Sequence, residues 1–385
     1  MEYFLMNKNT PLLKFETKYS LGSIMVKQTD SFSSVRPIGF KDIADWVDKR
    51  DYAKHKKHLS NWLKEWGIDT TDGFLQISHC LGINDTLWVK EINSELRWED
   101  VSLYQNPFTD VVSKTAFDSG LYGLHLKTTS PEFTNEGSFL KYWTFEDDGI
   151  YLYKFGSYGF ANAGQEPYSE YFASVISQLF QKDSVCYDLD FRHNRICSRC
   201  KLFTDESEGF VPIYKLLDDK NYSIAELLEF CSSMGFETEF RKMILIDSVI
   251  FNQDRHLGNF GFIVDNDTFE IKRFAPLFDF NMSMLARAMD DDLDRFEQYA
   301  KEYELEHKLG GDFVAVGREI ITPELRKELP RKLTLTQHPR YAMEDSRFQK
   351  LKTLFEENYA KILGSEHIRN SQKKSKKANE HDISI

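Results

Sequence analysis

The chain has 385 residues, of which 41% are hydrophobic and 14% aromatic, which suits two or three packed units and excludes a disordered chain. The formal net charge of −12, with a pI near 5.4, argues against general nucleic-acid binding. The first residues lack the apolar segment of a signal peptide, and no apolar run approaches the length of a membrane span. We therefore expect a soluble cytoplasmic protein without a membrane contact and without direct nucleic-acid binding.

Residues 1–115 carry the weakest sequence signals. Apolar positions with helical spacing occur in residues 40–47 and 52–66, and residues 82–90 are typical of a turn followed by a strand. The lysines and histidines of residues 54–58 would lie on the outer face of the second helix, either solvated or against an acidic partner. We expect an accessory domain whose role the sequence does not identify.

The next segment is predicted to hold a lysine on a strand and a glutamate on a helix. Residues 149–155 are aromatic and β-branched with Lys154 among them, and an apolar helix should then run to Phe180. Kinases position nucleotide phosphates with such a pair, so we assign Lys154 to the phosphates and Glu170 as its partner. Glu166 is an alternative partner near the same helix start. The simpler interpretation is an exposed strand lysine and a first-turn acid favoured by the helix dipole.

Five cysteines, an odd and sparse set, suit a reducing compartment. Residues 195–203 alternate in the manner of a half-buried β-strand. The alternative is a zinc site with four candidate ligands, Cys186, His193, Cys197 and Cys200. Strong zinc signatures carry two closely spaced pairs, whereas this chain has one, so we expect the strand.

A polar stretch at residues 204–209 is expected to cross from a small lobe to a large one. In a kinase, adenine would then bind by main-chain contacts near Leu202 and Phe203. Residues 222–234 and 238–251 have helical periodicity. The large lobe should therefore begin with two helices.

The most informative motif follows the second of these helices. Asp254 is followed by Asn259 five residues later, and by Asp279, in an apolar stretch, twenty residues after that. Phosphoryl transfer from ATP requires such parts in this order, because one carboxylate accepts the proton of the attacking hydroxyl while an amide oxygen and a second carboxylate hold magnesium. The alternative is a polar loop in which these residues act as caps and turn formers. That alternative does not explain the adjacent Arg255 and His256, so the motif indicates an ATP-dependent kinase.

Residues 261–264 and 269–274 are predicted to form a hairpin that brings Asp279 beside the loop. Helices should occupy much of residues 322–364. The residues from 366 to 385 are polar and lysine-rich, and we expect a disordered tail.

The segments NQDRHLGNF and APLFDF resemble the kinase core of HipA-like serine/threonine kinases. The resemblance implies an α+β, bilobal protein-kinase-like fold that uses ATP and Mg2+. It implies that Asp254 is the catalytic base, that Asn259 and Asp279 bind magnesium, and that Arg255 and His256 shape the loop. The specific motifs cover roughly residues 130–360. The expected domains are an accessory region (1–115), a small lobe (116–208), a large lobe (209–365) and the tail (366–385).

The loop that covers the phosphates in this family is a short Ser/Thr–Gly segment that ends in lysine. Residues 134–141 resemble it, with Gly137, Ser138 and Lys141 as the phosphate-contacting residues, although an ordinary β-turn remains the alternative. HipA-like kinases can phosphorylate a hydroxyl in this loop. By spacing, Thr134 is the first candidate for autophosphorylation and Ser138 the second.

Three functions remain in competition. The first is a serine/threonine kinase that acts on a protein substrate, with an antitoxin or other regulatory partner as the resemblance implies. The second is a lipid or small-molecule kinase, which would need a basic or apolar membrane-facing surface. The third is a nucleotide-binding regulator or toxin-module protein with little catalysis. Because every catalytic position is occupied, the sequence favours the first.

Overall fold

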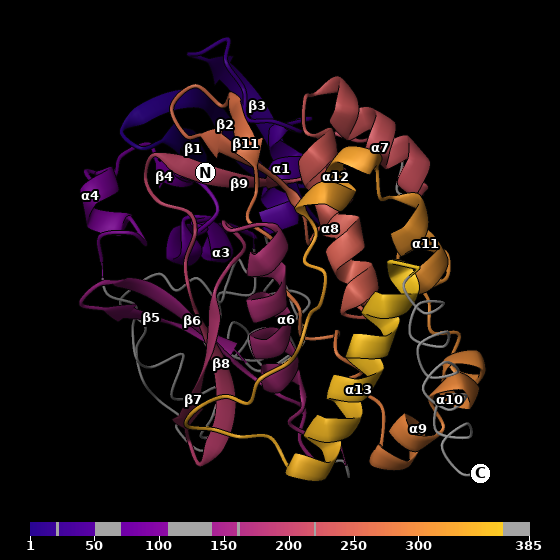
Figure 1. Cartoon of the computed structure of the whole chain (residues 1–385). Coiled ribbons are helices and arrows are strands. Elements are labelled where there is room, and N and C mark those ends of the chain that lie inside the picture. Colours follow the sequence, from indigo (N-terminus) through magenta and orange to yellow (C-terminus); the bar gives the residue numbers. More distant parts are fainter. Residues whose placement is uncertain (21–22, 51–70, 107–140, 160–161, 219–220, 365–385) are drawn as a thin grey trace, which may run out of the picture. The chain divides into compact units, whose positions relative to one another are not determined.

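The computed structural model describes residues 1–20, 23–50, 71–106, 141–159, 162–218 and 221–364 (Figure 1). The chain divides into two compact units. Unit 1 comprises Met1–Lys154, Arg199–Asp218 and Gly261–Ala275, and unit 2 comprises Phe155–Ser198, Asp219–Phe260 and Pro276–Ile385. Each unit is thus assembled from segments far apart in sequence. The consecutive domains expected from the sequence stay predictions, and the boundary near residue 115 lies outside the described residues.

Unit 1 contains a four-stranded sheet in the order β3-β2-β1-β4 (Figure 1). Its strands are β1 Glu2–Asn7, β2 Thr10–Ser20, β3 Ser23–Ser31 and β4 Leu87–Glu91. Strand β1 pairs antiparallel with β2 and β4, and β2 pairs antiparallel with β3. In β2, Leu13, Phe15 and Thr17 are buried and the residues between them are partly exposed, as expected when one face of a sheet lies on a core.

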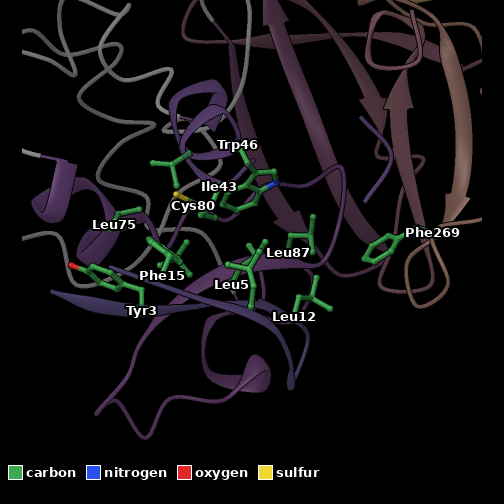
Figure 2. Packing of buried hydrophobic residues seen from close by; sticks show 13 residues of the cluster. Tyr3, Leu5, Leu12, Phe15, Ile43, Trp46, Leu75, Cys80, Leu87 and Phe269 are labelled. Carbon is green, nitrogen blue, oxygen red and sulfur yellow. The ribbon is translucent and has the colours of Figure 1, made fainter. Parts of the chain in front are cut away.

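The core on this sheet is closed by helices α1 Ile43–Arg50 and α3 Thr71–Ser78. Figure 2 shows Ile43 and Trp46 of α1 in one cluster with Leu5, Phe15 and Leu87 of the strands. A second cluster surrounds the short helix α4 Trp98–Val101. The accessory region is therefore a packed part of unit 1, and the burial of apolar side chains stabilises it.

A three-stranded sheet in the order β11-β10-β9 also lies in unit 1. It is formed by β9 Glu208–Pro212, β10 Gly261–Asp265 and β11 Ile271–Phe274, and both pairings are antiparallel. The 3-10 helix Ile213–Lys215 follows β9. At Gly261 an added Cβ would meet the carbonyl oxygen of Val211 and lie 2.8 Å from Cα of Pro212, so β9 leaves no room for a side chain there.

Four further strands form a sheet in the order β5-β6-β8-β7. They are β5 Lys141–Glu146, β6 Gly149–Phe155, β7 Tyr187–Arg192 and β8 Arg195–Lys201. The division between the units passes through β6 and β8. Strands β5 and β6 are antiparallel, and Tyr142 and Tyr153 stack across them with ring centroids 5.1 Å apart.

Unit 2 is mainly helical. Its helices are α6 Glu166–Phe180, α7 Ile224–Ser233, α8 Glu237–Val249, α9 Asp290–Asp294, α10 Phe296–Glu302, α11 Phe313–Glu319, α12 Pro323–Glu328 and α13 Asp345–Ile362. Helix α8 packs against α6, α7, α11 and α13 (Figure 1), and its residues from Met243 to Val249 are all buried. The loop that follows α8 therefore starts from a well-fixed position. In the described part of the chain, no helix is long and apolar enough to cross a membrane.

The structure confirms the α+β fold class and most of the predicted elements. The helices expected in residues 40–47, 166–180, 222–234 and 238–251 correspond to α1, α6, α7 and α8. The expected strand at residues 149–155 is β6, the hairpin is β10–β11, and α12 and α13 lie within residues 322–364. The helix expected in residues 52–66 and the tail lie outside the described residues.

The alternating segment at residues 195–203 contains strand β8, as predicted, and its Cys197 and Cys200 are buried free thiols. His193, by contrast, lies in the turn between β7 and β8, with a φ of 49°. Among the described residues, no group of three or more histidine, cysteine, aspartate or glutamate side chains is arranged to hold a metal ion.

Candidate active site

The loop after α8 is fixed by a buried ion pair between Arg255 and Asp247. Nε and Nη2 of Arg255 donate hydrogen bonds to the two carboxylate oxygens of Asp247, at 2.8 and 3.0 Å. Both side chains are 0% exposed. A bidentate guanidinium–carboxylate contact fixes orientation as well as distance. The course of the loop is therefore set by a residue near the end of α8.

Two amide side chains define the backbone around Asp254. Nδ2 of Asn252 donates to Asp247 at 2.8 Å, and its Oδ1 accepts the N–H of Asp254 at 3.1 Å. Nδ2 of Asn259 donates to the carbonyl oxygen of Asp254 at 3.0 Å. Asp254 is thus held from both sides through its main chain, while its carboxylate stays partly exposed.

His256 shapes the turn between Asp254 and Asn259. The main-chain N–H of His256 donates to the carbonyl oxygen of Asp254 at 2.8 Å, and its main-chain carbonyl oxygen accepts the N–H of Asn259 at 2.9 Å. Its Nδ1 accepts the N–H of Gly258 at 3.0 Å. With Nδ1 as an acceptor in this bond, Nε2 is the ring nitrogen that carries a proton.

Arg255 also joins the loop to the segment that carries Asp279. Its Nη1 donates to the carbonyl oxygens of Asn259 and Phe278, at 2.7 and 2.8 Å. The N–H of Asp279 donates to the hydroxyl of Tyr187 at 3.2 Å, and Asp279 has a φ of 60°. Few non-glycine residues adopt this conformation, and aspartate is among those that tolerate it. One guanidinium thus brings together the three positions predicted from their spacing.

The residue after Asp279 is held from a second direction. Phe280 is fully buried, with the guanidinium carbon of Arg255 lying 5.5 Å from its ring centroid. The hydroxyl of Ser169, on α6, lies 2.7 Å from the carbonyl oxygens of Phe280 and Ser283. Helix α6 therefore helps to fix the backbone that follows Asp279.

The two candidate carboxylates influence each other electrostatically. Burial raises the pKa of Asp254 above its ordinary value of 3.8, His256 opposes this shift, and the charge of Asp279 adds to it. Lys308 and Arg287 lower the pKa of Asp254 more weakly. Two carboxylates that repel each other are stabilised by a cation bound between or beside them.

These side chains suit a magnesium ion. Asp279 offers carboxylate oxygens, and because the nitrogen of the Asn259 amide donates to Asp254, its oxygen is the atom left for a cation. Hard oxygen donors are what Mg2+ prefers, and this ion usually retains several waters and binds substrate phosphates. Two protein ligands, completed by phosphate and water, would therefore hold it.

The two lysines predicted to bind phosphates are neighbours in unit 1. Lys141 of β5 and Lys154 of β6 are directly paired across the antiparallel strands. Lys154 is buried, with 8% of its surface exposed. Residues directly opposite each other in antiparallel strands project from the same face of the sheet. The pairing thus fits a phosphate-binding role for both.

The glutamates on α6 are both buried. Glu170 is 1% exposed and accepts a hydrogen bond from the hydroxyl of Ser198. Glu166 is 7% exposed and accepts the N–H of Ser157 at 3.1 Å. Neither is the solvated first-turn acid of the simpler interpretation. The ion pair between Lys154 and Glu170 stays a prediction.

Leu202 and Phe203, expected near adenine, follow directly after β8. The N–H of Leu202 donates to the carbonyl oxygen of Ile150 at 2.8 Å, so this main-chain donor is already used within unit 1. The ring of Phe203 meets that of Phe210 edge-on at 5.7 Å. The candidate phosphate-loop residues Thr134, Gly137 and Ser138 lie outside the described residues.

Several residues that build this site were not predicted. Asp247 pairs with Arg255, Asn252 orients Asp254, and Tyr187 and Ser169 hold the Asp279 segment. Only Asp247 had a recognisable signal, because a charged residue within the apolar run of α8 needs a buried partner.

Comparison with known proteins gives structural similarity without sequence matches. No protein-family model matches the chain, and no curated protein matches it significantly. The chain is similar to the Helicobacter pylori proinflammatory kinase CtkA, with 19% identity, a TM-score of 0.46, and coverage of 62% of this chain and 93% of that chain. It is also similar to HipA from Shewanella oneidensis MR-1, solved as a toxin–antitoxin complex with HipB and operator DNA. That match has 10% identity, a TM-score of 0.48, and coverage of 94% of this chain and 96% of that chain.

Proposed function

We propose that this chain is an ATP- and magnesium-dependent kinase of HipA-like type that phosphorylates a serine or threonine hydroxyl of a protein. The observation that carries the proposal is the position of Arg255. It is bonded to Asp247, to the carbonyl of Asn259 and to the carbonyl beside Asp279, so the predicted base and metal ligands share one rigid support. A polar loop that merely connects helices needs no such arrangement.

In the proposed reaction, the substrate hydroxyl oxygen attacks the γ-phosphorus of ATP. The bond from this phosphorus to the β,γ-bridging oxygen breaks, ADP leaves, and the hydroxyl proton passes to the carboxylate of Asp254. A raised pKa makes Asp254 a better proton acceptor than an ordinary aspartate, provided that it is ionised at the working pH. The partial exposure of Asp254 and its fixed backbone fit this role.

The remaining residues act on the charge of the nucleotide. Asn259 and Asp279 would hold Mg2+, which neutralises negative charge on the phosphates when bound. Lys141 and Lys154 would add positive charge from adjacent strands. Glu170 is assigned to orient Lys154, in the manner of the strand-lysine and helix-glutamate pair of kinases.

We base the proposed substrate class and partner on the resemblance of the loop motif. HipA-like kinases act on serine or threonine in proteins, and the Shewanella structure contains an antitoxin protein, HipB. We therefore propose a protein substrate in the cytoplasm and an antitoxin or similar regulatory partner. The net charge of −12 disfavours nucleic acid as a direct ligand of this chain.

The central experiment is a radiolabelled-ATP assay on the purified chain with a cell lysate as substrate. Asp254→Ala and Asp279→Ala should each nearly abolish transfer, whereas the exposed Asp291→Ala serves as the control and should retain wild-type turnover. Magnesium chelation should have the same effect as Asp279→Ala. Wild-type turnover in both active-site variants would contradict the site assignment, and labelled lipid instead of protein would contradict the substrate class.

Autophosphorylation is the finer part of the proposal. Thr134, or Ser138 as second choice, would receive phosphate when the chain is incubated with Mg-ATP. The added negative charge would repel the ATP phosphates and favour release of the loop. Phosphosite mapping tests this, and an active enzyme with no modification between residues 134 and 138 would contradict it.

A further inference from the structure

The predicted crossover segment, residues 204–209, is attached to the accessory region by a shared carboxylate. Glu206 accepts hydrogen bonds from Nε1 of Trp98 at 2.5 Å and from the hydroxyl of Ser102 at 3.1 Å. Nε2 of Gln105 lies 2.9 Å from each of its two oxygens. Three donors from α4 and the residues after it therefore converge on one side chain of the segment.

A second set of bonds ties both ends of the segment to residues 83 and 84. The buried hydroxyl of Thr204 donates to the carbonyl oxygen of Ile83, which also accepts the hydroxyl of Tyr104 at 2.8 Å. At the other end, the N–H of Phe210 donates to the carbonyl oxygen of Asn84 at 2.7 Å. The accessory region thus contacts the segment through its backbone as well as through Glu206.

The turn between β10 and β11 supplies a third attachment. Nδ2 of Asn266 donates to the carbonyl oxygen of Asp205 at 3.0 Å, and the carbonyl of Asn266 accepts Nδ2 of Asn7 at 2.7 Å. An added Cβ at Gly209 would meet Oδ1 of Asn266 and lie 2.6 Å from the carbonyl oxygen of Asn84. Glycine at this position allows the close approach.

The same accessory residues also pack against Leu202. Leu202 lies against the apolar cluster that contains Ile83 and Trp98. A nucleotide base bound by main-chain contacts is sensitive to small displacements of that main chain, because hydrogen bonds weaken steeply with distance and angle. Loosening a pre-organised site costs affinity even when no ligand contact is removed.

We infer that the accessory region fixes the position of residues 202–209 and thereby sets the affinity for nucleotide, with Trp98 and Glu206 as positioning residues. The inference rests on the proposed function, because it assumes that the chain binds a nucleotide. It adds a role for the accessory region. Neither residue contacts nucleotide in this scheme, so their effect passes through the backbone of the crossover segment.

The test compares two tryptophan variants that remove the same kind of bond. Trp98→Phe removes the indole donor to Glu206 and keeps an aromatic ring in the cluster. Trp88→Phe is the matched control, because Trp88 belongs to the same cluster but its Nε1 donates to the carbonyl oxygen of Lys8 at 2.7 Å. Two readouts are recorded, namely hydrogen exchange of residues 202–210 without nucleotide, and the Kd of a non-hydrolysable ATP analogue with magnesium.

We expect Trp98→Phe to speed exchange in residues 202–210 and to weaken analogue binding by about three- to tenfold, which corresponds to the net contribution of one ordinary hydrogen bond. The KM for ATP should rise in the same proportion while kcat changes by less than about twofold. Trp88→Phe should change neither the exchange of this segment nor the Kd. A purely structural role for Trp98 would instead lower stability in both variants and leave the Kd unchanged.

Glu206→Ala sharpens the test. If Trp98 acts through Glu206, then Trp98→Phe should have no further effect on Kd in the Glu206→Ala background. Additive effects of the two changes would overturn the inference, as would unchanged exchange in Trp98→Phe, or faster exchange with an unchanged Kd. Absence of nucleotide binding in the wild type would overturn the proposed function, while the exchange comparison would still decide whether Trp98 and Glu206 fix the segment.

Discussion

Two polar networks fix the backbone at the candidate functional positions, and they use different chemistry. In unit 2, the loop after α8 depends on Arg255 and Asp247, whose side chains are both 0% exposed. In unit 1, the crossover segment depends on Glu206, a partly exposed carboxylate that receives neutral donors from Trp98, Ser102 and Gln105. One network is a buried pair of opposite charges, and the other is a single charge near water.

This difference predicts how each network responds to damage. A buried charge that loses its partner cannot be resolvated without opening the structure around it, so the whole of unit 2 should lose stability. A carboxylate near the surface can exchange its protein donors for water, so the effect should stay local. Global stability should therefore report on the first network, and local exchange or ligand affinity on the second.

The largest effect is expected for Asp247→Asn, which keeps the size of the side chain and leaves Arg255 buried without its counter-charge. We expect a loss of about 3–5 kcal/mol in the free energy of unfolding, measured by urea denaturation followed by circular dichroism. Adding Arg255→Met should recover part of this loss, because the uncompensated charge is then gone. A loss below about 1 kcal/mol would show that the pair does not support the loop.

Glu206→Ala should have a smaller effect on stability, of about 1–2 kcal/mol, since it removes bonds to neutral donors and leaves no buried charge without a partner. Faster hydrogen exchange should be confined to residues 202–210 and to α4. Uniformly faster exchange throughout unit 1 would mean that this carboxylate supports the global fold, and the contrast with Asp247 would fail.

Asp254→Asn should stabilise the nucleotide-free protein slightly while removing activity. The pKa of Asp254 is raised in the folded state above 3.8, so the folded state binds its proton more tightly than the unfolded state does. Its contribution to stability is therefore favourable at low pH and is lost as pH rises through the folded pKa. Thermal melts of wild type and variant should be recorded at pH values on both sides of the folded pKa of Asp254. The two melting temperatures should differ most at pH values above this pKa, where the variant should have the higher Tm. A variant that melts lower at neutral pH would contradict the repulsion between Asp254 and Asp279.

The smallest effect is expected for Lys49→Ala on α1. Lys49 contacts Asp45 at 2.7 Å, four residues earlier, and the two side chains are 44% and 29% exposed. Such pairs contribute roughly 0.3–0.5 kcal/mol. This variant serves as a reference for the other stability measurements. Its loss in the free energy of unfolding gives the contribution of an exposed ion pair that belongs to neither network.

The grouping of three candidate site residues could be predicted because the signal lies in their order and spacing along the chain. Asp254, Asn259 and Asp279 carry functional groups whose order alone is informative, and the loop brings them together. Asp247 was missed because its contact with Arg255 depends on how the chain reverses after α8. The expected roles of Asn259 and Asp279 toward magnesium, and of Lys154 toward phosphate, remain predictions.

Strand β4 of the N-terminal sheet lies where the sequence predicted a strand, but strands β1 to β3 could not be predicted, for a physical reason. The pairing of β1 with β2 shifts register between Leu5 and Met6, and that of β2 with β3 shifts between Lys14 and Phe15. Each irregularity interrupts the alternation of apolar and polar residues by which strands are recognised. Leu12 and Leu13 are consecutive and both buried, which alternation alone would not allow.

The fixed position of Phe280 has a pharmacological consequence. In ordinary protein kinases the metal-binding aspartate is followed by phenylalanine and glycine, and the packing of that phenylalanine sets the active or inactive state. Here the ring is fully buried beside Arg255, its carbonyl oxygen lies 2.7 Å from the hydroxyl of Ser169, and Asn281 replaces the glycine. If the proposed function holds, compounds selected for displacing this ring should therefore bind this chain poorly.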